Sequence, residues 1–194
     1  MAGRAGLTAQ KLIQAGAEMA DDLGFEQVTL SALARRFDVK VASLYSHLKN
    51  SEDLKVRLAL LALDELADCA GEAIAGRSGK DALFALANAY RHYGQAHPGR
   101  FVAARYPLSD EVVAASSGVK LSRMLGAVLR AYGLVDAEQT HAIRFLGSVF
   151  LGYTTLESAG GFSHGDVAAQ ASWERTLAVL DLSLRHWPQS SAAV

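Results

Sequence analysis

The apolar residues between positions 29 and 48 recur at the spacing of two short helices joined by a tight turn. Thr29 precedes the first helix and is a good N-cap, since its hydroxyl can accept a hydrogen bond from a free amide of the first turn. Asp38 stands at the bend, where the backbone usually needs a positive φ that Asp tolerates better than most residues. The residues predicted to pack across the turn are Leu30, Leu33, Ala34 and Phe37 in the first helix and Leu44 and Leu48 in the second. This pattern predicts a helix-turn-helix, a unit with which many proteins bind DNA.

The second of these helices would present its outer residues to the major groove of DNA. Small side chains allow the helix to approach closely, and a serine hydroxyl or an alanine methyl can touch base edges. The residues predicted to face the bases are Lys40, Val41, Ala42, Ser43 and Ser46. Tyr45, His47 and Lys49 are predicted to contact phosphates, and Thr29 completes the predicted DNA-binding set.

Charge supports DNA binding only locally. Residues 35–49 carry four basic residues and one acidic residue, whereas residues 1–55 carry seven of each sign. The predicted electrostatic footprint is therefore a narrow stripe and not a basic domain. The alternative is that residues 29–48 form two ordinary helices of an all-helical core, in which Tyr45 and His47 are half-buried packing residues.

These residues also carry a family resemblance. Residues 7–54 are similar to the N-terminal domain of TetR/AcrR-type bacterial transcriptional regulators through the segments AEMADDLGFEQVT, SALARRFDV, LYSHL and SEDL. HPGRF at 97–101 and the residues that follow Ala142 resemble the WHG-type subgroup, with Leu151-Gly152 at the position of its His-Gly pair. The departures from the family pattern are Asp38 for the usual Gly, Lys40 for a frequent Ser, Ala42 for Gly or Pro, Leu48 for Phe, and Ser51 for a basic residue. The last change leaves one phosphate contact of the family without its usual residue.

Helical periodicity continues along the rest of the chain, so the predicted fold is all-α with about nine helices. Beyond the helix-turn-helix, helices are expected at about 8–23, 51–74, 80–96, 98–105, 109–132 with an interruption near 118, 137–159 and 166–186. The helix at 51–74 is apolar on more than one side, which predicts that it is sandwiched between other elements. We place the boundary between two domains within this helix. The predicted domains are a helix-turn-helix DNA-binding domain, residues 1–50, and a ligand-binding and dimerisation domain, residues 51–194.

Composition indicates an ordinary globular chain. A hydrophobic fraction of 51%, a charged fraction of 20% and a net charge of −1 argue against disorder. The single cysteine, Cys69, rules out an intramolecular disulfide, fits a reducing cytoplasm and is expected to be buried on a helix. No apolar run resembles a signal peptide or reaches the roughly 20 residues needed to cross a bilayer. A cytoplasmic protein is therefore expected.

The sequence holds no motif for metal or covalent chemistry. His92 and His97 are five residues apart and do not share a helix face, and neither HExxH nor CxxC occurs. No GxSxG elbow or Gly-rich phosphate loop follows a strand. We therefore expect no metal, no cofactor and no enzymatic activity.

The last predicted helix carries an apolar seam formed by Trp173, Leu177, Leu180, Leu184 and Trp187. Apolar surface beyond the seam comes from Ala178, Val179 and Leu182. On the preceding helix we assign Phe150 to the same surface, and Gly147 and Gly152 would permit close approach of another helix. Excess apolar surface on two adjacent helices predicts a symmetric homodimer through a four-helix bundle. The alternative is that both stripes are consumed in the core of one chain.

The middle helices carry aromatic and soft side chains of the kind that line apolar ligand sites. These residues are Phe84, Tyr90, Tyr93, Phe101, Tyr106, Met124, Phe145 and Tyr153. The TetR-type resemblance implies a small-molecule site among such helices of the C-terminal domain. The alternative is that all eight are ordinary core residues.

Together with the resemblance, these features lead us to expect a dimeric regulator that binds double-stranded operator DNA, implied to be a repressor released by a small-molecule inducer. In the hypothesised mechanism the ligand favours a conformer in which helix 51–74 swings and changes the spacing of the two recognition helices. Two other functions stay open. One is a helical small-molecule carrier or enzyme whose N-terminal helices only pack, and the other is a regulator that needs no ligand.

Overall fold

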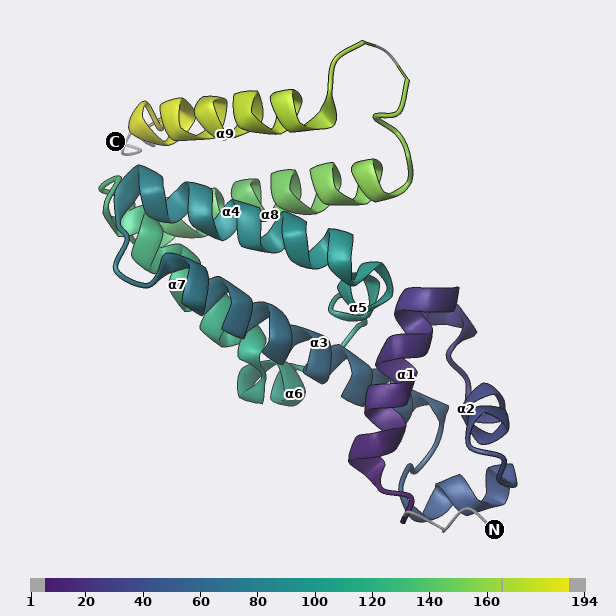
Figure 1. Ribbon diagram of the computed structural model, residues 1–194. Coiled ribbons are helices and arrows are strands. Elements are labelled where there is room, and N and C mark those ends of the chain that lie inside the picture. The colour runs from purple at the N-terminus through teal and green to yellow at the C-terminus, as the bar shows by residue number, and fades with distance from the viewer. Residues whose placement is uncertain (1–5, 165, 189–194) are drawn as a thin grey trace. The chain divides into compact units, whose positions relative to one another are not determined.

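The computed structural model describes residues 6–164 and 166–188, which fold into nine α-helices and two short 3-10 helices without a strand (Figure 1). The α-helices are α1 (Ala9–Leu23), α2 (Leu30–Arg36), α3 (Ser51–Ile74), α4 (Gly79–Ala96), α5 (Pro98–Ala103), α6 (Asp110–Ala115), α7 (Ser117–Arg130), α8 (Asp136–Ser158) and α9 (Ala169–Arg185). The 3-10 helices are η1 (Phe25–Gln27) and η2 (Val41–Ser46). None of the described helices is long and apolar enough to cross a membrane. The all-α prediction is confirmed.

Local side chains begin and end the first helices where the sequence predicted. The hydroxyls of Thr8 and Thr29 accept hydrogen bonds from the amides of Lys11 and Ala32 at 3.2 and 3.1 Å, and so cap α1 and α2. Gly24 ends α1 with φ at 93°, a region that glycine enters at little cost.

One expectation about the helices is confirmed and two need correction. The interruption expected near 118 lies at Ser116, whose extended backbone separates α6 from α7. The last helix, α9, begins at Ala169 and not near 166. Cys69 is exposed on α3 and not buried. Leu66 and Ala70 lie on the buried face of α3. Cys69 directly precedes Ala70, and successive residues of a helix are rotated by about 100°, so its side chain points away from that face.

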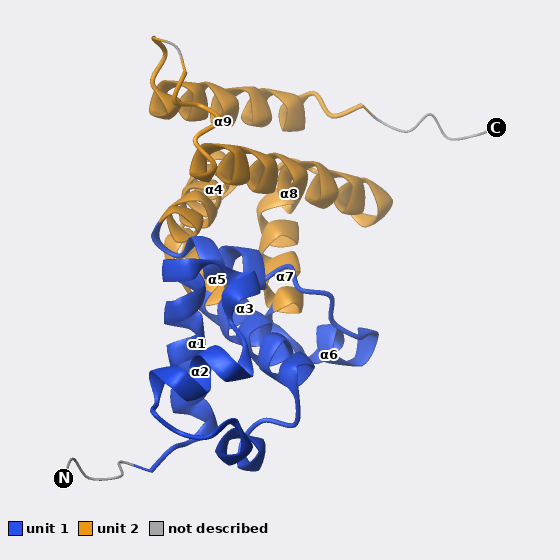
Figure 2. Cartoon of the chain, turned by 90° about the vertical axis from the view of Figure 1, so that its right-hand side faces the viewer, with its two compact units in different colours: residues 1–65, 96–117 blue, residues 66–95, 118–194 orange. Residues whose placement is uncertain are grey.

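The chain divides into two compact units, which Figure 2 colours separately. Unit 1 comprises residues 1–65 and 96–117, and unit 2 comprises residues 66–95 and 118–194. This division differs from the predicted boundary at residue 50, because the first half of α3 and the whole of α5 pack with the N-terminal helices. The chain passes between the units three times, inside α3, near the end of α4 and at the start of α7.

The core of unit 1 holds the helix-turn-helix against its neighbours. Leu12 of α1, Leu33 of α2, Leu44 of η2 and Leu54 of α3 are fully buried in one cluster, which Ala103 of α5 joins. Each leucine buried in this way contributes about 1.5–3 kcal/mol. The segment that would read DNA is therefore anchored in a core that it shares with α1, α2 and α3.

The start of α5 lies directly on the end of α1. A Cβ added to Gly99 would lie 1.9 Å from the carbonyl oxygen of Ala20, so only glycine allows this approach. Beside it, the Asp21 carboxylate accepts the Arg100 amide at 2.9 Å and pairs with Arg100 Nε at 3.0 Å and His97 Nδ1 at 3.1 Å. The HPGRF segment thus has a structural role in unit 1.

In unit 2, α9 packs its apolar seam against α4 and α8. The Trp173 ring is fully buried, lies 6.3 Å from the Phe150 ring of α8 and donates from Nε1 to Asn88 Oδ1 of α4 at 2.7 Å. Farther along α9, the Tyr132 hydroxyl donates to Asp181 Oδ1 at 2.7 Å, and burial raises the pKa of Tyr132. These polar contacts fix the register of a helix that is otherwise held by apolar packing.

Candidate nucleic-acid interface

The turn between α2 and η2 has the predicted geometry. Phe37 donates from its amide to the Leu33 carbonyl at 3.1 Å, and the Val39 amide donates to Ala34 at 3.0 Å, so the chain reverses without leaving these groups unpaired. Asp38 between them has φ at 51°, in the left-handed region. The positive φ inferred at this position is confirmed.

The recognition segment is a 3-10 helix and not an α-helix. Ser43 donates from its amide to the Lys40 carbonyl at 2.9 Å, and the His47 amide donates to the Leu44 carbonyl at 2.9 Å, both over three residues. Leu44 and Leu48 are buried, as predicted. Because these two leucines attach the segment to the core, its other side chains face outward.

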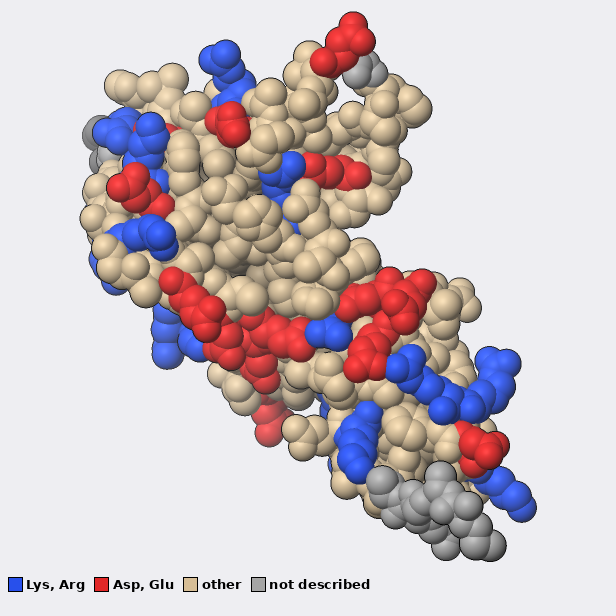
Figure 3. Space-filling view, in the orientation of Figure 1, with Lys and Arg blue, Asp and Glu red and all other residues tan. Residues whose placement is uncertain are grey.

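Charges of both signs lie on the visible face of unit 1 (Figure 3). Arg36, one of the four basic residues between 35 and 49, forms an ion pair with Glu18 of α1. Lys55 pairs with Glu26 at 2.6 Å, and its ammonium also lies 5.2 Å from the centre of the Phe25 ring. Acidic partners thus compensate part of the basic charge of this unit.

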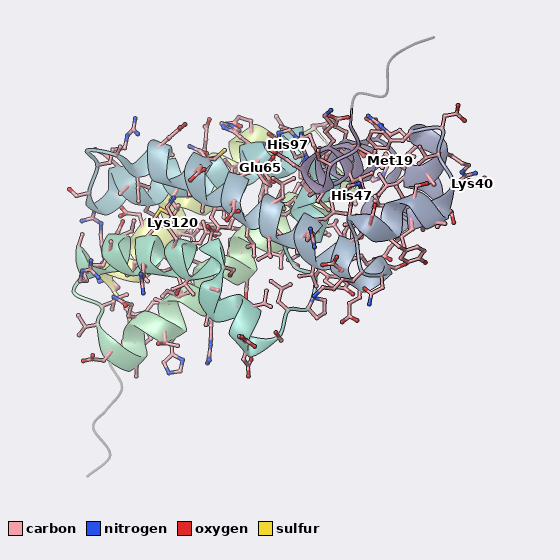
Figure 4. All side chains as sticks on the ribbon, turned by 90° about the horizontal axis from the view of Figure 1, so that it is seen from below. Met19, Lys40, His47, Glu65, His97 and Lys120 are labelled. Atoms are coloured by element: carbon pink, nitrogen blue, oxygen red, sulfur yellow. The ribbon has the colours of Figure 1, made fainter. Side chains whose placement is uncertain are left out.

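The structure leaves most of the predicted DNA-contacting side chains accessible. Tyr45 is 56% exposed, although a core role was its alternative interpretation. Lys40 lies at the outer edge of unit 1 (Figure 4). Of the nine residues predicted to contact DNA, Thr29, Lys40, Ala42, Ser43, Tyr45, Ser46 and Lys49 are exposed, and Val41 and His47 are half-buried. The Thr29 hydroxyl is already used as the α2 cap.

A polar clamp that the sequence analysis missed follows the recognition segment. Asn50 Oδ1 accepts the Asp53 amide at 2.8 Å, and Asp53 Oδ2 accepts the Lys49 amide at 2.9 Å. Arg57 Nε donates to the other oxygen of Asp53 at 2.9 Å. Burial alone would raise the pKa of Asp53, but the hydrogen bonds from Arg57 and the Lys49 amide lower it. The available signal was the spacing of Asn50 and Asp53, three residues apart at the start of α3 as in a capping box, although the Asp53 carboxylate binds the Lys49 amide and not that of Asn50.

The predicted dimer seam needs correction. Phe150, Trp173, Leu177, Leu180 and Leu184 are buried inside unit 2 of one chain, which is the alternative interpretation. Trp187 is half-buried, with Nε1 donating to Glu138 at 2.8 Å and its ring 5.8 Å from the Phe145 ring. The large apolar side chains left exposed on the two helices are Phe145 and Leu156 on α8 and Val179 and Leu182 on α9.

The eight residues predicted to line a ligand site do not form one group. Phe101 and Tyr106 belong to unit 1, where Tyr106 packs 5.9 Å from the Phe25 ring, and the other six belong to unit 2. Within unit 2, Phe145 is exposed, Tyr93 is buried, and Phe84, Tyr90, Met124 and Tyr153 are half-buried. Burial raises the pKa of Tyr90 to about 12, so its hydroxyl stays protonated at neutral pH.

Comparison with known proteins identifies relatives that match most of the chain. The family model for the tetracyclin repressor-like C-terminal domain matches residues 83–180. The uncharacterized HTH-type transcriptional regulator Rv0681 of Mycobacterium tuberculosis is 32% identical over 79% of this chain and 72% of its own. The uncharacterized HTH-type transcriptional regulator YobS of Bacillus subtilis is 31% identical over 84% of this chain and 85% of its own.

Solved structures share the fold. BioQ of Mycobacterium smegmatis superposes with a TM-score of 0.71 at 22% identity, over 94% of this chain and all of that one. A structure of BioQ with its double-stranded DNA operator gives a TM-score of 0.67 at 23% identity, over 93% of this chain and 99% of that one. At these identities the likeness concerns the arrangement of the helices.

Proposed function

This chain belongs to the TetR family of helix-turn-helix transcriptional regulators, and from that premise we propose that it binds a palindromic operator as a homodimer under the control of a small-molecule effector. The effector releases the protein from DNA, so the protein acts as a repressor. Its site of action is the cytoplasm, and it has no enzymatic role. Residues 1–50 read DNA, and the effector and the second protomer bind to the part of residues 51–194 that forms unit 2.

The observation that carries this proposal is the outward edge of η2. Buried Leu44 and Leu48 fix the segment, while Ala42, Ser43 and Ser46 stay exposed and are small enough for the segment to enter a major groove. These three residues and Lys40 and Val41 meet the bases in our proposal.

Phosphate contacts come from the side chains at the end of the segment. Tyr45 and His47 donate hydrogen bonds, and Lys49 supplies a charge. The Asp53 carboxylate holds the Lys49 amide at 2.9 Å and so positions the start of α3 beside the DNA backbone.

Homodimerisation uses the residues beyond the buried seam. Phe145 and Leu156 on α8 and Val179 and Leu182 on α9 keep large apolar surfaces in contact with solvent. A Cβ added to Gly152, on the same face of α8 as Phe145 and Leu156, would meet nothing within 4 Å, so another helix can approach closely there. A second copy of this pair of helices completes a four-helix bundle.

The effector acts through a shift between two conformers. A ligand bound in unit 2 favours the conformer in which α3 swings, and the two recognition segments then lose the spacing of the operator half-sites. Coupling energies of about 1–3 kcal/mol, roughly 5- to 150-fold in affinity, are typical of such systems.

A gel-shift titration of the full chain against DNA from upstream of its own coding region tests this function. We expect tight, salt-sensitive binding that scrambled DNA does not compete. Equal affinity for scrambled DNA would favour a carrier or enzyme whose N-terminal helices only pack. Selective binding that no metabolite of a screen alters would favour a regulator without a ligand.

Three variants test the proposed contacts. Tyr45→Ala and Lys49→Ala should weaken binding to all sequences, the latter with a salt slope reduced by about 1, whereas Ser43→Ala should change base preference. Lys120→Ala is the matched control, because Lys120 is an exposed cation of unit 2 paired with Asp68. Unchanged affinity and preference in all three variants would reject this docking face.

A further inference from the structure

A buried cation in unit 2 joins α4 to α8 and α9. Arg91 of α4 is 5% exposed. Its Nε and Nη2 atoms donate to the two carboxylate oxygens of Glu157 on α8 at 2.7 and 2.6 Å, and Nη1 donates to Gln170 Oε1 on α9 at 2.6 Å. The guanidinium therefore holds one planar carboxylate in the two-bond geometry that arginine favours.

Aromatic rings form the surroundings of this guanidinium. Its carbon lies 5.4 Å from the centre of the Trp173 ring and 5.8 Å from the centre of the Tyr153 ring. The two rings contact each other with 4.7 Å between centroids, and the Tyr153 hydroxyl donates to the Ala169 carbonyl at 2.6 Å. Arg91 is thus oriented by its aromatic neighbours and by Gln170 as well as by Glu157.

Glu157 is the less firmly enclosed member of the pair. Its side chain is 13% exposed against 6% for that of Arg91, and it is the last residue but one of α8. Gln95 Nε2 donates to the same carboxylate at 3.0 Å. Rotation of the Glu157 side chain toward solvent would leave the Arg91 fork and the Gln95 amide pointing at the space vacated by its carboxylate.

Another polar side chain on this face of α8 is buried without a hydrogen-bond partner among the described residues. The hydroxyl of Thr154, three residues before Glu157 and fully buried, makes no hydrogen bond to any described residue. A buried ion pair is also a weak source of stability, since apolar residues in its place are often neutral or stabilising. Packing alone therefore does not account for the polar groups of this helix face.

We propose that the Arg91 guanidinium is a binding site for an organic carboxylate, which takes the place of the Glu157 carboxylate. The inference rests on the proposed effector-controlled function and names the chemical class of the effector. The exchange is non-covalent: the ligand oxygens accept the two hydrogen bonds from Arg91, and Glu157 becomes hydrated. The exchange breaks the contact between the end of α8 and α4, while the hydrogen bond between Arg91 and Gln170 of α9 remains. Ligand binding would therefore change how α8 packs within unit 2.

Benzoate, with benzamide as its uncharged isostere, is the probe. The full-length wild-type chain and Glu157→Gln are titrated, and the thermal unfolding midpoint is followed at ionic strength held constant with sodium chloride. Removal of the internal competitor should lower the apparent dissociation constant for benzoate by at least about tenfold. Glu157→Asp, which shortens the competing side chain by one methylene, should lie between the two and replaces Glu157→Gln if that variant does not fold.

Two controls isolate the site. Arg91→Met combined with Glu157→Gln should abolish the benzoate response, and benzamide should shift none of the proteins. Asp181→Asn removes the partner of Arg185, whose side chain is 54% exposed, and should respond to benzoate no more than wild type. Equal benzoate affinity in wild type and Glu157→Gln, or an equal response to benzamide, would overturn the proposal and leave Arg91–Glu157 as a structural pair.

Operator binding by the same preparations, without benzoate, keeps the two proposals separate. A wild-type chain that binds no operator selectively refutes the regulatory function, whereas the benzoate comparison still decides whether Arg91 accepts an external carboxylate. Selective operator binding without the difference between wild type and Glu157→Gln refutes the carboxylate site alone.

Discussion

Leu182 on α9 is the side chain on which the proposed dimer depends most. It is 57% exposed, and Val179, one turn earlier, is 52% exposed, although both belong to a helix whose other face is fully buried. Leu182→Ser removes apolar surface from the exposed face and leaves the buried seam untouched. If this face meets its counterpart in a second copy, the substitution weakens dimerisation without unfolding the protomer.

The magnitude follows from the surface that remains to be covered. Complete burial of a leucine contributes about 1.5–3 kcal/mol, so the 57% still exposed is worth roughly 0.9–1.7 kcal/mol in each protomer. Twofold symmetry doubles this to about 2–3 kcal/mol. The dimer dissociation constant should rise about 30- to 150-fold.

Sedimentation velocity over a dilution series measures that constant, and thermal unfolding checks the protomer. Val113→Ser is the matched control, because Val113 of unit 1 is 44% exposed and lies outside the proposed interface. Trp173→Ala should instead lower the free energy of unfolding by about 3–5 kcal/mol, since that ring is buried in the core. Equal dissociation constants for wild type and Leu182→Ser would refute the reasoning.

Three further substitutions test local features of the fold. Asp38→Gly should raise the free energy of unfolding by up to about 1 kcal/mol and Asp38→Ala should lower it, because the backbone has a φ of 51° there, which glycine adopts more easily than alanine. The reverse order of stability in a urea titration would contradict this. Gly99→Ala should lower the free energy of unfolding by at least about 2 kcal/mol, since the new Cβ would lie 1.9 Å from a backbone atom. Gly147→Ala is the control: its new Cβ would meet nothing within 4 Å, so it should raise the free energy of unfolding by about 0.5–1 kcal/mol. Similar changes in both variants would be inconsistent with the α1–α5 contact. Burial alone would raise the pKa of Asp181, but hydrogen bonds from Arg185 and Tyr132 hold it below its ordinary value of 3.8. The stabilisation by ionised Asp181 is therefore complete well above pH 3.8 and is lost as the pH falls through the lowered pKa. Asp181→Asn should lower the free energy of unfolding by roughly 1–3 kcal/mol at pH 7 and flatten its dependence on acid pH. Identical acid-unfolding curves for wild type and Asp181→Asn would exclude this role.

Features set by neighbouring residues were predictable from the sequence. The Thr29 cap, the positive φ of Asp38 and the burial of Leu44 and Leu48 each depend on residues within about one helical turn. Short-range geometry leaves few alternatives at such positions. The same holds for the bounds of α1 and α3, which agree with the sequence to within a residue or two.

Contacts between distant segments were not predictable in the same way. Periodicity indicates that the face of α9 bearing Trp173 is apolar, but it does not say whether α4 and α8 of the same chain or a second copy covers it. The assignment of Trp173 to a dimer was wrong, because Asn88 and Phe150 already enclose it. Ala178, Val179 and Leu182, noted only as additional surface, are the residues left exposed.

The predicted ligand set was scattered for a related reason. Phe101 was grouped with the aromatic residues of unit 2, yet α5 packs in unit 1 because Gly99 lets its backbone approach Ala20. The close approach of α5 to α1 depends on the missing side chain of Gly99, and the positions of aromatic residues along the sequence do not reveal it. The Arg91–Glu157 pair, 66 residues apart, was missed because neither residue is part of a local motif.

The three passages of the chain between the units bear on how the protein is synthesised. A ribosome that has just released residue 65 has not yet made α5, so the nascent α1 lacks the helix that covers its end until residue 103 emerges. By then all of α3 and α4 has been translated, including residues that belong to the other unit. Unit 1 is complete only once residue 117 has emerged, so the DNA-reading part of this regulator cannot finish folding before residues 66–95 of the other unit have been translated.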